Sequence, residues 1–173
     1  MFLFFVRHFN DIDHLTPVAW KMKKANHAVA VYCMNPRFDY RRDYRLCFLK
    51  ELGVTVDYLH HQFDGQRGRI HELLNAAMHK AYAAQKRFGA DSRRAPFYKR
   101  LIGYVAGQLG TLFYKLLRFG YYNLRWARAV LEKSGARVIC FDHIMPGLYV
   151  VGNLLKAAQQ MSIPSFALPH GVL

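Results

Sequence analysis

The sequence predicts an α/β fold: a doubly wound parallel sheet of about five or more strands with helices on both faces. Short apolar runs recur along the chain, each followed by a polar loop and then by a helical pattern. Strands that alternate with helices indicate parallel βαβ units. The runs are continuously apolar rather than alternating, which is typical of strands covered on both faces.

The five apolar runs predict strands at 2–6, 28–33, 54–59, 137–141 and 165–168. Helical patterns begin near residue 17 and then cover 42–52, 70–87, 97–133 and 148–161. Thr16 is a candidate N-cap of the first helix, because Pro17 suits the first helical position. Gly53 and Gly135 are expected to end two helices, and Gly120 is expected to break the longest one.

Length and composition are those of a folded domain with an anionic partner. The 173 residues suit one domain, and 53% hydrophobic residues exclude intrinsic disorder. The net charge of +14 points to nucleic acid, an anionic membrane surface or a phosphorylated substrate. We expect neither a transmembrane helix nor a signal peptide, because the apolar runs are too short for either. We expect a cytoplasmic protein, with peripheral attachment to the inner face of the cell membrane as an option.

Three cysteines, Cys33, Cys47 and Cys140, are scattered along the chain without CxxC spacing. An odd and scattered set favours neither a disulfide framework nor a zinc site. We therefore expect reduced thiols, and Cys33 and Cys140 lie in apolar runs where cysteine packs as a small hydrophobe.

Polar side chains follow three of the predicted strands, in RHFNDIDH (7–14), DHIMPG (142–147) and PHG (169–171). If the strand order reverses between the first and fourth strands, these loops meet at one crevice. The residues expected there are His8, Asp13, His14, Asp142, His143 and His170. Histidine beside a carboxylate is the usual general-base arrangement. The alternative is that these side chains cap helices and satisfy loop amides.

Several site motifs are missing from the sequence. The first strand is not followed by GxGxxG, and GxxxxGK[ST] does not occur, which disfavours a classical dinucleotide or P-loop site. Neither a GxSxG elbow nor a cysteine placed for nucleophilic catalysis occurs. His60 and His61 end the third strand, and we interpret them as solvent-facing loop residues rather than metal ligands. Neither a metal nor a cofactor is expected.

The basic excess is concentrated between residues 80 and 128, where only Asp91 opposes the cations. At about 100° per residue, the apolar side of this helical segment carries Leu101, Val105, Leu109, Leu112, Leu116, Trp126 and Val130. The opposite side carries Lys99, Arg100, Lys115, Arg118, Arg125, Arg128, Tyr104, Tyr121 and Tyr122. This face suits anionic membrane headgroups, RNA, or solvent alone. Membrane ranks above nucleic acid because RNA-binding signatures are absent from the sequence.

Two segments of the chain resemble the N-terminal domain of GT-B-type transferases: FLFFVRHFNDIDHLTPVAWKMKKANHAVAVY and ICFDHIMPGLYVVGNLLKAAQQMSIPSFALPHGV. The similar group comprises bacterial surface-polysaccharide glycosyltransferases and CDP-glycerol glycerophosphotransferase-like proteins, with UDP-N-acetylglucosamine 2-epimerases as more distant relatives. Thr16-Pro17-Val18 is similar to the start of their first helix. Asp142 through Gly171 is similar to their Asp-bearing loop, helix and Ile-Pro-led fifth strand. RHFNDIDH departs from the arginine-proline loop of the epimerases.

The resemblance implies a single Rossmann-like, acceptor-side domain over 1–173, the N-terminal half of a GT-B architecture. The donor-binding C-terminal domain would lie outside this chain, which is expected to be inactive alone. The implied activity transfers a glycosyl or glycerophosphate group from a nucleotide-activated donor to a polysaccharide or lipid-linked hydroxyl.

The resemblance also implies roles for individual residues. His14 is the expected base, and Asp13 or Asp142 would orient it or substitute for it. The cleft for substrate and donor would be lined by Arg7, His8, Asn10, His143, His170 and Gly171. The competing hypothesis is a non-enzymatic basic α/β module that binds RNA or an anionic membrane surface.

Overall fold

The computed structural model describes residues 1–35, 38–89, 96–142 and 149–168, and the chain forms two compact units. The first, here called the sheet unit, consists of Met1–Gln62 and Leu124–Leu173. The second, here called the hairpin unit, is Phe63–Asn123. The domain expected over 1–173 therefore contains an inserted helical unit that the sequence pattern did not separate.

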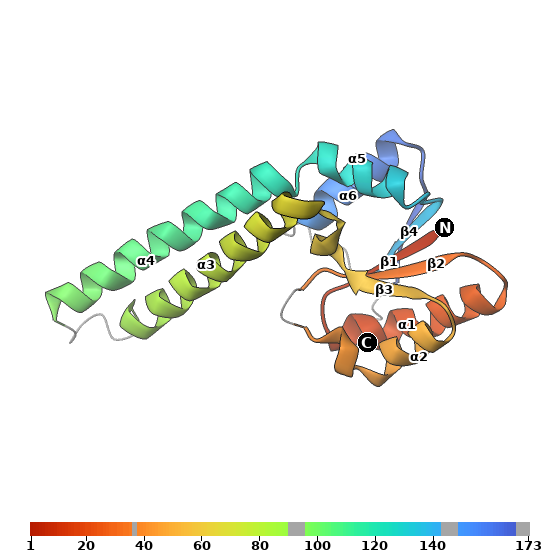
Figure 1. Cartoon of the computed structure of the whole chain (residues 1–173), viewed down its shortest axis with the longest axis horizontal. Helices are drawn as coiled ribbons and strands as arrows, with labels where there is room; N and C mark the ends of the chain where they lie inside the picture. The colour runs from red at the N-terminus through yellow and green to blue at the C-terminus, as the bar shows by residue number, and fades with distance from the viewer. Residues whose placement is uncertain (36–37, 90–95, 143–148, 169–173) are drawn as a thin grey trace. The chain divides into compact units, whose positions relative to one another are not determined.

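The sheet unit is built on five parallel strands in the order β3-β2-β1-β4-β5 (Figure 1). The strands are β1 (Phe2–Val6), β2 (Val29–Cys33), β3 (Thr55–Tyr58), β4 (Val138–Phe141) and β5 (Ser165–Ala167). The α-helices are α1 (Phe9–Lys24), α2 (Tyr44–Glu51), α5 (Leu124–Lys133) and α6 (Tyr149–Gln160), with short 3₁₀ turns η1 (Tyr40–Arg42) and η2 (Leu59–Gln62). The predicted α/β class is confirmed. The strand order reverses between β1 and β4, which is the condition under which the polar loops were expected to meet.

Helices cover both faces of this sheet, as predicted. Figure 1 shows α1 and α2 against one face and α5 and α6 against the other. Because successive strand residues point to opposite faces, Phe4 of β1 packs in the core beneath α1 and α2. Phe5 points to the other face, where its ring stacks on Phe141 with centroids 5.1 Å apart. Each such fully buried side chain contributes about 1.5–3 kcal/mol relative to exposure.

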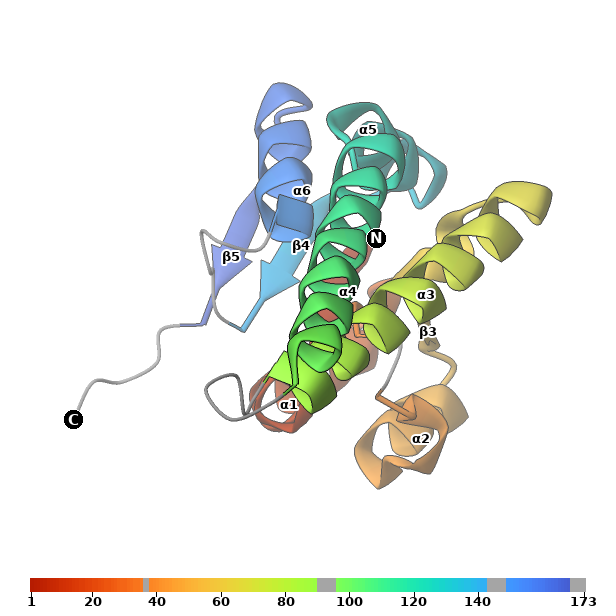
Figure 2. The same ribbon diagram turned by 90° about the vertical axis from the view of Figure 1, so that its left-hand side faces the viewer.

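The edge strand β5 departs from the expectation of burial on both faces. Figure 2 shows it beside β4 at one end of the sheet. All three of its residues are exposed, and Phe166 keeps 59% of its surface accessible. Near it, an apolar cavity of about 290 Å³ lies between the strands and α1, with Leu15, Val18 and Phe166 in its lining. An apolar run therefore identifies a strand without showing that neighbours cover it.

The first helix begins eight residues earlier than predicted. α1 starts at Phe9, so Pro17 lies inside the helix and Thr16 is not its N-cap. The polar segment expected to be a loop is instead mostly the first turns of α1. Its start is fixed by Asp11, whose carboxylate accepts a hydrogen bond from the backbone N–H of Arg7 at 2.8 Å. The N-cap residue, His8, makes no side-chain capping hydrogen bond, so the start of α1 lacks the capping signal predicted at Thr16.

The other helix ends follow ordinary capping chemistry. The side chain of Asp43 accepts hydrogen bonds from the backbone N–H groups of Arg45 and Leu46 at the start of α2. Gly53 and Gly135 follow α2 and α5 with φ of +75° and +61°, the left-handed conformation that commonly ends a helix. These two glycine stops agree with the prediction.

The hairpin unit consists of α3 (Gly65–Gly89), α4 (Phe97–Leu116) and a π-helical turn, η3 (Leu117–Tyr121). The helix predicted over 97–133 is thus interrupted, as expected, around Gly120. At the end of the unit near η3, the buried His71 ring packs against the rings of Phe63, Tyr121 and Tyr122. Tyr122 is therefore buried rather than part of an exposed basic face.

Candidate active site

The carboxyl ends of β1 and β4 carry the polar cluster that the sequence predicted. These two strands pair in parallel, with Phe5 opposite Phe141, so the residues that follow them emerge at one edge. The strand order reverses between them, and ligands of open α/β sheets bind at such a switch point. Three aspartates buried in the described part of the chain lie on segments that start here or on the neighbouring α2: Asp11, Asp43 and Asp142.

His14 and Asp142 form the central contact of this cluster. The Nδ1 atom of His14, on α1, lies 2.7 Å from Oδ1 of Asp142, the residue that directly follows β4. The carboxylate is 1% exposed, whereas the imidazole is 47% exposed. An ionised carboxylate only accepts hydrogen bonds, so a neutral imidazole paired with it carries its proton on Nδ1 and its lone pair on Nε2. This is the arrangement of an accessible general base oriented by a buried carboxylate.

Arg7 and Asp11 form a second ion pair beside the first. Arg7 donates from Nε and Nη2 to the two carboxylate oxygens of Asp11, each at 2.8 Å. Burial alone raises the pKa of Asp11, but the hydrogen bonds and charge of Arg7 outweigh burial and hold that pKa below its ordinary value. The same hydrogen bonds raise the pKa of Arg7. Arg7 therefore fixes the turn from β1 into α1, and its guanidinium is already engaged by a carboxylate.

Asp13 pairs with Arg45 at the start of α2. Arg45 also donates from Nε to Asp43 at 3.0 Å, and its hydrogen bonds to Asp43 raise the pKa of the guanidinium. Of the two carboxylates expected beside His14, Asp142 is the one whose oxygen lies within hydrogen-bond distance of Nδ1. The sequence reasoning missed Arg45 and Asp43, although Asp43 could have been found as the N-cap of the helix predicted over 42–52.

The remaining predicted cleft residues divide into two groups. Asn10 is exposed on the first turn of α1, and His8 places Nδ1 3.6 Å from Oδ1 of Asp11. His143, His170 and Gly171 lie outside the described residues. The structure thus brings together Arg7, His8, His14 and Asp142 around the edge formed by β1 and β4.

Two of the three cysteines are unsuited to nucleophilic chemistry. All three are free, and Cys33 and Cys140 are buried. Burial raises the pKa of Cys33 to about 12 and that of Cys140 to about 11. These two thiols stay protonated near neutral pH and act as packing groups.

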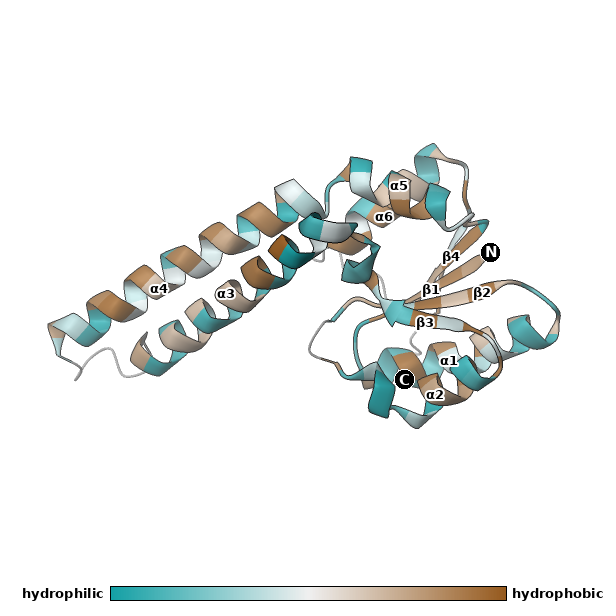
Figure 3. Cartoon of the chain, in the orientation of Figure 1, coloured by the Kyte–Doolittle hydropathy of each residue, from teal (hydrophilic) through white to brown (hydrophobic). Residues whose placement is uncertain are grey.

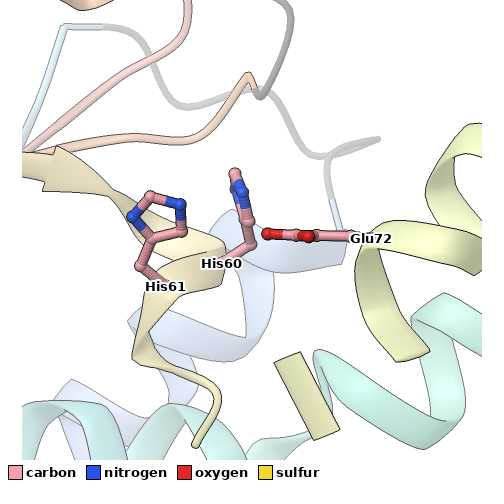
Figure 4. A group of neighbouring side chains, drawn as sticks. All are labelled: His60, His61 and Glu72. Atoms are coloured by element: carbon pink, nitrogen blue, oxygen red, sulfur yellow. The ribbon is translucent and has the colours of Figure 1, made fainter. Parts of the chain in front are cut away.

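His60 and His61 differ from the solvent-facing pair that the sequence suggested. Figure 4 shows both on η2, where His60 is buried and His61 is exposed, with ring centroids 4.6 Å apart. His61 Nδ1 lies 2.7 Å from Oδ1 of Asp57, one turn earlier on β3. Glu72, also labelled there, belongs to α3 of the hairpin unit. Asp57 and His61 are four residues apart in sequence, so their contact is a local one at the end of β3.

The predicted basic face is distributed over both units. Lys99, Arg100, Tyr104, Lys115 and Arg118 are exposed in the hairpin unit. Arg125 and Arg128 are exposed on α5 of the sheet unit, where Arg128 donates to Oε1 of Gln160 at 2.7 and 3.1 Å. Trp126 and Val130 are buried in the sheet unit. The residues that the sequence pattern placed on one helix thus belong to two units: α4 and η3 to the hairpin unit, and α5 to the sheet unit.

Comparison with known proteins identifies no relative: no family model, curated protein or solved structure matches the chain. Within the ranges that the structure describes, no helix combines the length and apolar character needed to cross a membrane. The functional assignment therefore depends on the fold and on the chemistry of the site.

Proposed function

We propose that the sheet unit is the acceptor-side part of a transferase of surface-polysaccharide biosynthesis. Its reaction would move a glycosyl or glycerophosphate group from a nucleotide-activated donor to a hydroxyl acceptor. The observation that carries the proposal is the 2.7 Å contact between His14 and Asp142 at the switch point of the sheet. The resemblance of both ends of the chain to GT-B-type transferases supplies the class of donor.

In the proposed reaction, Nε2 of His14 takes the proton of the acceptor hydroxyl while its oxygen attacks the donor. A bond forms from that oxygen to the anomeric carbon or to the phosphorus of the donor. The bond from the same atom to the nucleotide leaving group breaks, and the leaving group keeps the electron pair. Asp142 stabilises the imidazolium that results, because its buried carboxylate faces Nδ1.

Arg7 and Asp11 are positioning residues in this proposal. Their bidentate pair holds the turn between β1 and α1, and therefore the first turns of the helix that carries His14. A base must sit within hydrogen-bond reach of the proton it removes, so a shift of this turn would lower the rate without removing any reacting group.

The test is nucleotide release by the whole polypeptide encoded by the reading frame that contains this chain. CDP-glycerol and UDP-N-acetylglucosamine serve as donors, and a cell-wall polysaccharide fraction serves as acceptor. His14→Ala should lower turnover by roughly 10²–10⁴-fold, the usual contribution of a general base. Asp142→Asn should also lower turnover, because the amide no longer stabilises the charged ring.

His27→Ala is the matched control, because His27 is an exposed histidine just before β2. It lies at the amino ends of the strands, whereas the candidate site lies at their carboxyl ends. His27→Ala should leave turnover unchanged. Equal turnover in the wild type and His14→Ala would show that His14 is not the general base. If neither donor gives nucleotide release that depends on the acceptor, the proposed reaction is overturned.

A non-enzymatic module that binds an anionic surface is the second candidate, and the charge of the hairpin unit favours it. That unit holds eleven Lys and Arg against three Asp and Glu, a net charge of +8. Experiments can distinguish the two candidate functions. Substitutions in the sheet unit test the transferase activity, and substitutions in α4 test the binding surface.

A further inference from the structure

The two long helices of the hairpin unit pack through small residues. α3 and α4 lie side by side in both views (Figures 1 and 2). The buried residues of α4 are Gly103, Ala106, Gly107 and Gly110. A Cβ added at Gly107 would lie 2.7 Å from the side-chain amide of Gln85, and one at Gly110 would lie 2.9 Å from the Tyr82 ring. The glycines thus let α3 approach closely, and α4 places its small side against its neighbour.

The larger apolar side chains of α4 consequently remain exposed. Six of them, here called the α4 apolar face, keep 44–51% of their surface accessible: Leu101, Ile102, Val105, Leu109, Leu112 and Leu116. An amphipathic helix normally turns such a stripe toward a core. Figure 3 shows α4 with strongly hydrophobic residues along its length. Four members of the stripe, Leu101, Ile102, Val105 and Leu109, line a shallow apolar depression together with Ala106.

Cations and tyrosine side chains are exposed elsewhere on α4. Lys99 and Arg100 are exposed near the start of α4, and Lys115 is exposed near its end. Tyr98 and Tyr104 are exposed on the same helix. The sequence has no Asp or Glu between Asp91 and Glu132, so no carboxylate on α4 offsets these charges. The helix therefore combines an apolar stripe with positive charge at both of its ends.

We propose that the α4 apolar face binds the surface of an anionic lipid bilayer, with α4 lying in the plane of the headgroups. Apolar side chains would enter the boundary between headgroups and acyl chains, and the Lys and Arg side chains would reach anionic headgroups. A helix of 20 residues is about 30 Å long, so α4 offers an extended contact line. This inference is independent of the proposed transferase reaction.

The observations favour a bilayer over the other occupants of such a face. A second copy of the chain would bring together two units that each carry a net charge of +8, which repel each other. Single-stranded RNA would use the cations and tyrosines but would leave the six aliphatic side chains in water. An anionic bilayer is the partner that suits both the apolar stripe and the cations exposed near the two ends of the same helix.

The experiment measures co-sedimentation of the whole chain with vesicles of phosphatidylglycerol and phosphatidylcholine in equal parts, and with pure phosphatidylcholine vesicles. The wild type should bind the mixed vesicles and bind the neutral ones at least tenfold more weakly. Leu109→Asp should weaken binding to the mixed vesicles by at least tenfold, because it places a carboxylate in the apolar boundary. Lys115→Gln should weaken binding by about fivefold, the usual effect of one cation near an anionic surface.

Leu73→Asp is the matched control, because Leu73 is a 70% exposed leucine on α3 and the substitution makes the same change of charge. It should lower affinity by no more than the loss of charge does in Lys115→Gln. Circular dichroism of each variant shows whether the helices are retained. Equal binding by Leu109→Asp and Leu73→Asp would overturn the role of the α4 apolar face.

A reporter variant gives a reading that does not depend on loss of binding. A tryptophan at Val105 should be quenched by brominated phospholipids on vesicle addition, whereas a tryptophan at Leu73 should not. A gel shift with single-stranded RNA is run on the same proteins. Tight RNA binding that is insensitive to Leu109→Asp, together with no quenching at position 105, would assign the surface to nucleic acid and overturn the proposal.

Discussion

His14 and Asp142 lie 128 residues apart in sequence, yet their side chains are in direct contact. The pairing of β1 with β4 causes this contact, because it places the start of α1 beside the residue that follows β4. The sequence named both residues but left Asp13 as an equal partner of His14. In the structure Asp13 pairs with Arg45 of α2, whereas the Asp142 carboxylate contacts the His14 ring.

The Arg7–Asp11 pair makes stability depend on pH in acid. The pKa of folded Asp11 lies below its ordinary value of 3.8, so the unfolded chain binds its proton more readily than the folded chain does. The stabilisation by this pair is therefore complete above pH 3.8 and is lost as the pH falls through the folded pKa. We expect Asp11→Asn to lower the free energy of unfolding by about 2–3 kcal/mol at pH 7, because the buried charged hydrogen bonds are lost.

Urea unfolding at a series of pH values checks this prediction. The difference between wild type and Asp11→Asn should shrink as the pH falls below 3.8. Glu51→Gln removes a carboxylate from an exposed position at the end of α2 and should cost less than about 0.5 kcal/mol. A difference between wild type and Asp11→Asn that stays constant down to pH 2 would show that Arg7 does not stabilise the charged form.

At the scale of elements, α4 shows why an amphipathic pattern does not identify the buried side of a helix. The apolar side of the pattern, which includes Leu101, Leu109 and Leu116, is exposed. The buried side is instead the row of glycines, because small residues let two helix backbones approach closely. The sequence predicts a helix break at Gly120, which the structure shows, whereas the close packing at Gly107 and Gly110 is seen only in the structure.

Alanine substitutions at Gly107 and Gly110 should have different effects. Alanine gains about 1 kcal/mol of helix propensity over glycine at either position. At Gly107 the clash is with the terminal amide of Gln85, which can rotate away, so Gly107→Ala should be neutral or stabilising. At Gly110 the new methyl group meets the rigid Tyr82 ring, so overpacking of about 1–3 kcal/mol should outweigh the propensity gain.

Thermal or urea unfolding of the two variants, followed by helical circular dichroism, measures this difference. The double variant Gly110→Ala with Tyr82→Ala removes the ring and should recover part of the lost stability. Equal stability of Gly107→Ala and Gly110→Ala would contradict the close approach of α3 at Gly110.

At the scale of the whole molecule, the chain separates an α/β unit from a helical one. The charge is unevenly divided: the hairpin unit carries +8 of the total +14 over about a third of the residues. The candidate base lies in the other unit, on α1. The net charge therefore bears more on the bilayer contact that we propose for the hairpin unit than on the chemistry of the sheet unit.

Replacement of Phe63–Asn123 by a flexible glycine-serine linker tests this division. The core of the sheet unit is formed by its own residues, such as Phe4, Leu46 and Ile139, so we expect a cooperative urea transition for the shortened chain. The shortened chain should also lose affinity for anionic vesicles. A broad, non-cooperative transition would show that the sheet unit depends on the hairpin for its folding.

The sequence alone determined the α/β class, all five strands and the break at Gly120. Those features follow from local patterns: apolar runs for strands, helical spacing for helices, and glycine where a helix stops or breaks. Only the tertiary structure showed that α1 begins at Phe9, that Asp142 rather than Asp13 orients His14, and that the leucines of α4 are exposed. These depend on which surfaces meet in space, and a local pattern of residue types does not contain that information.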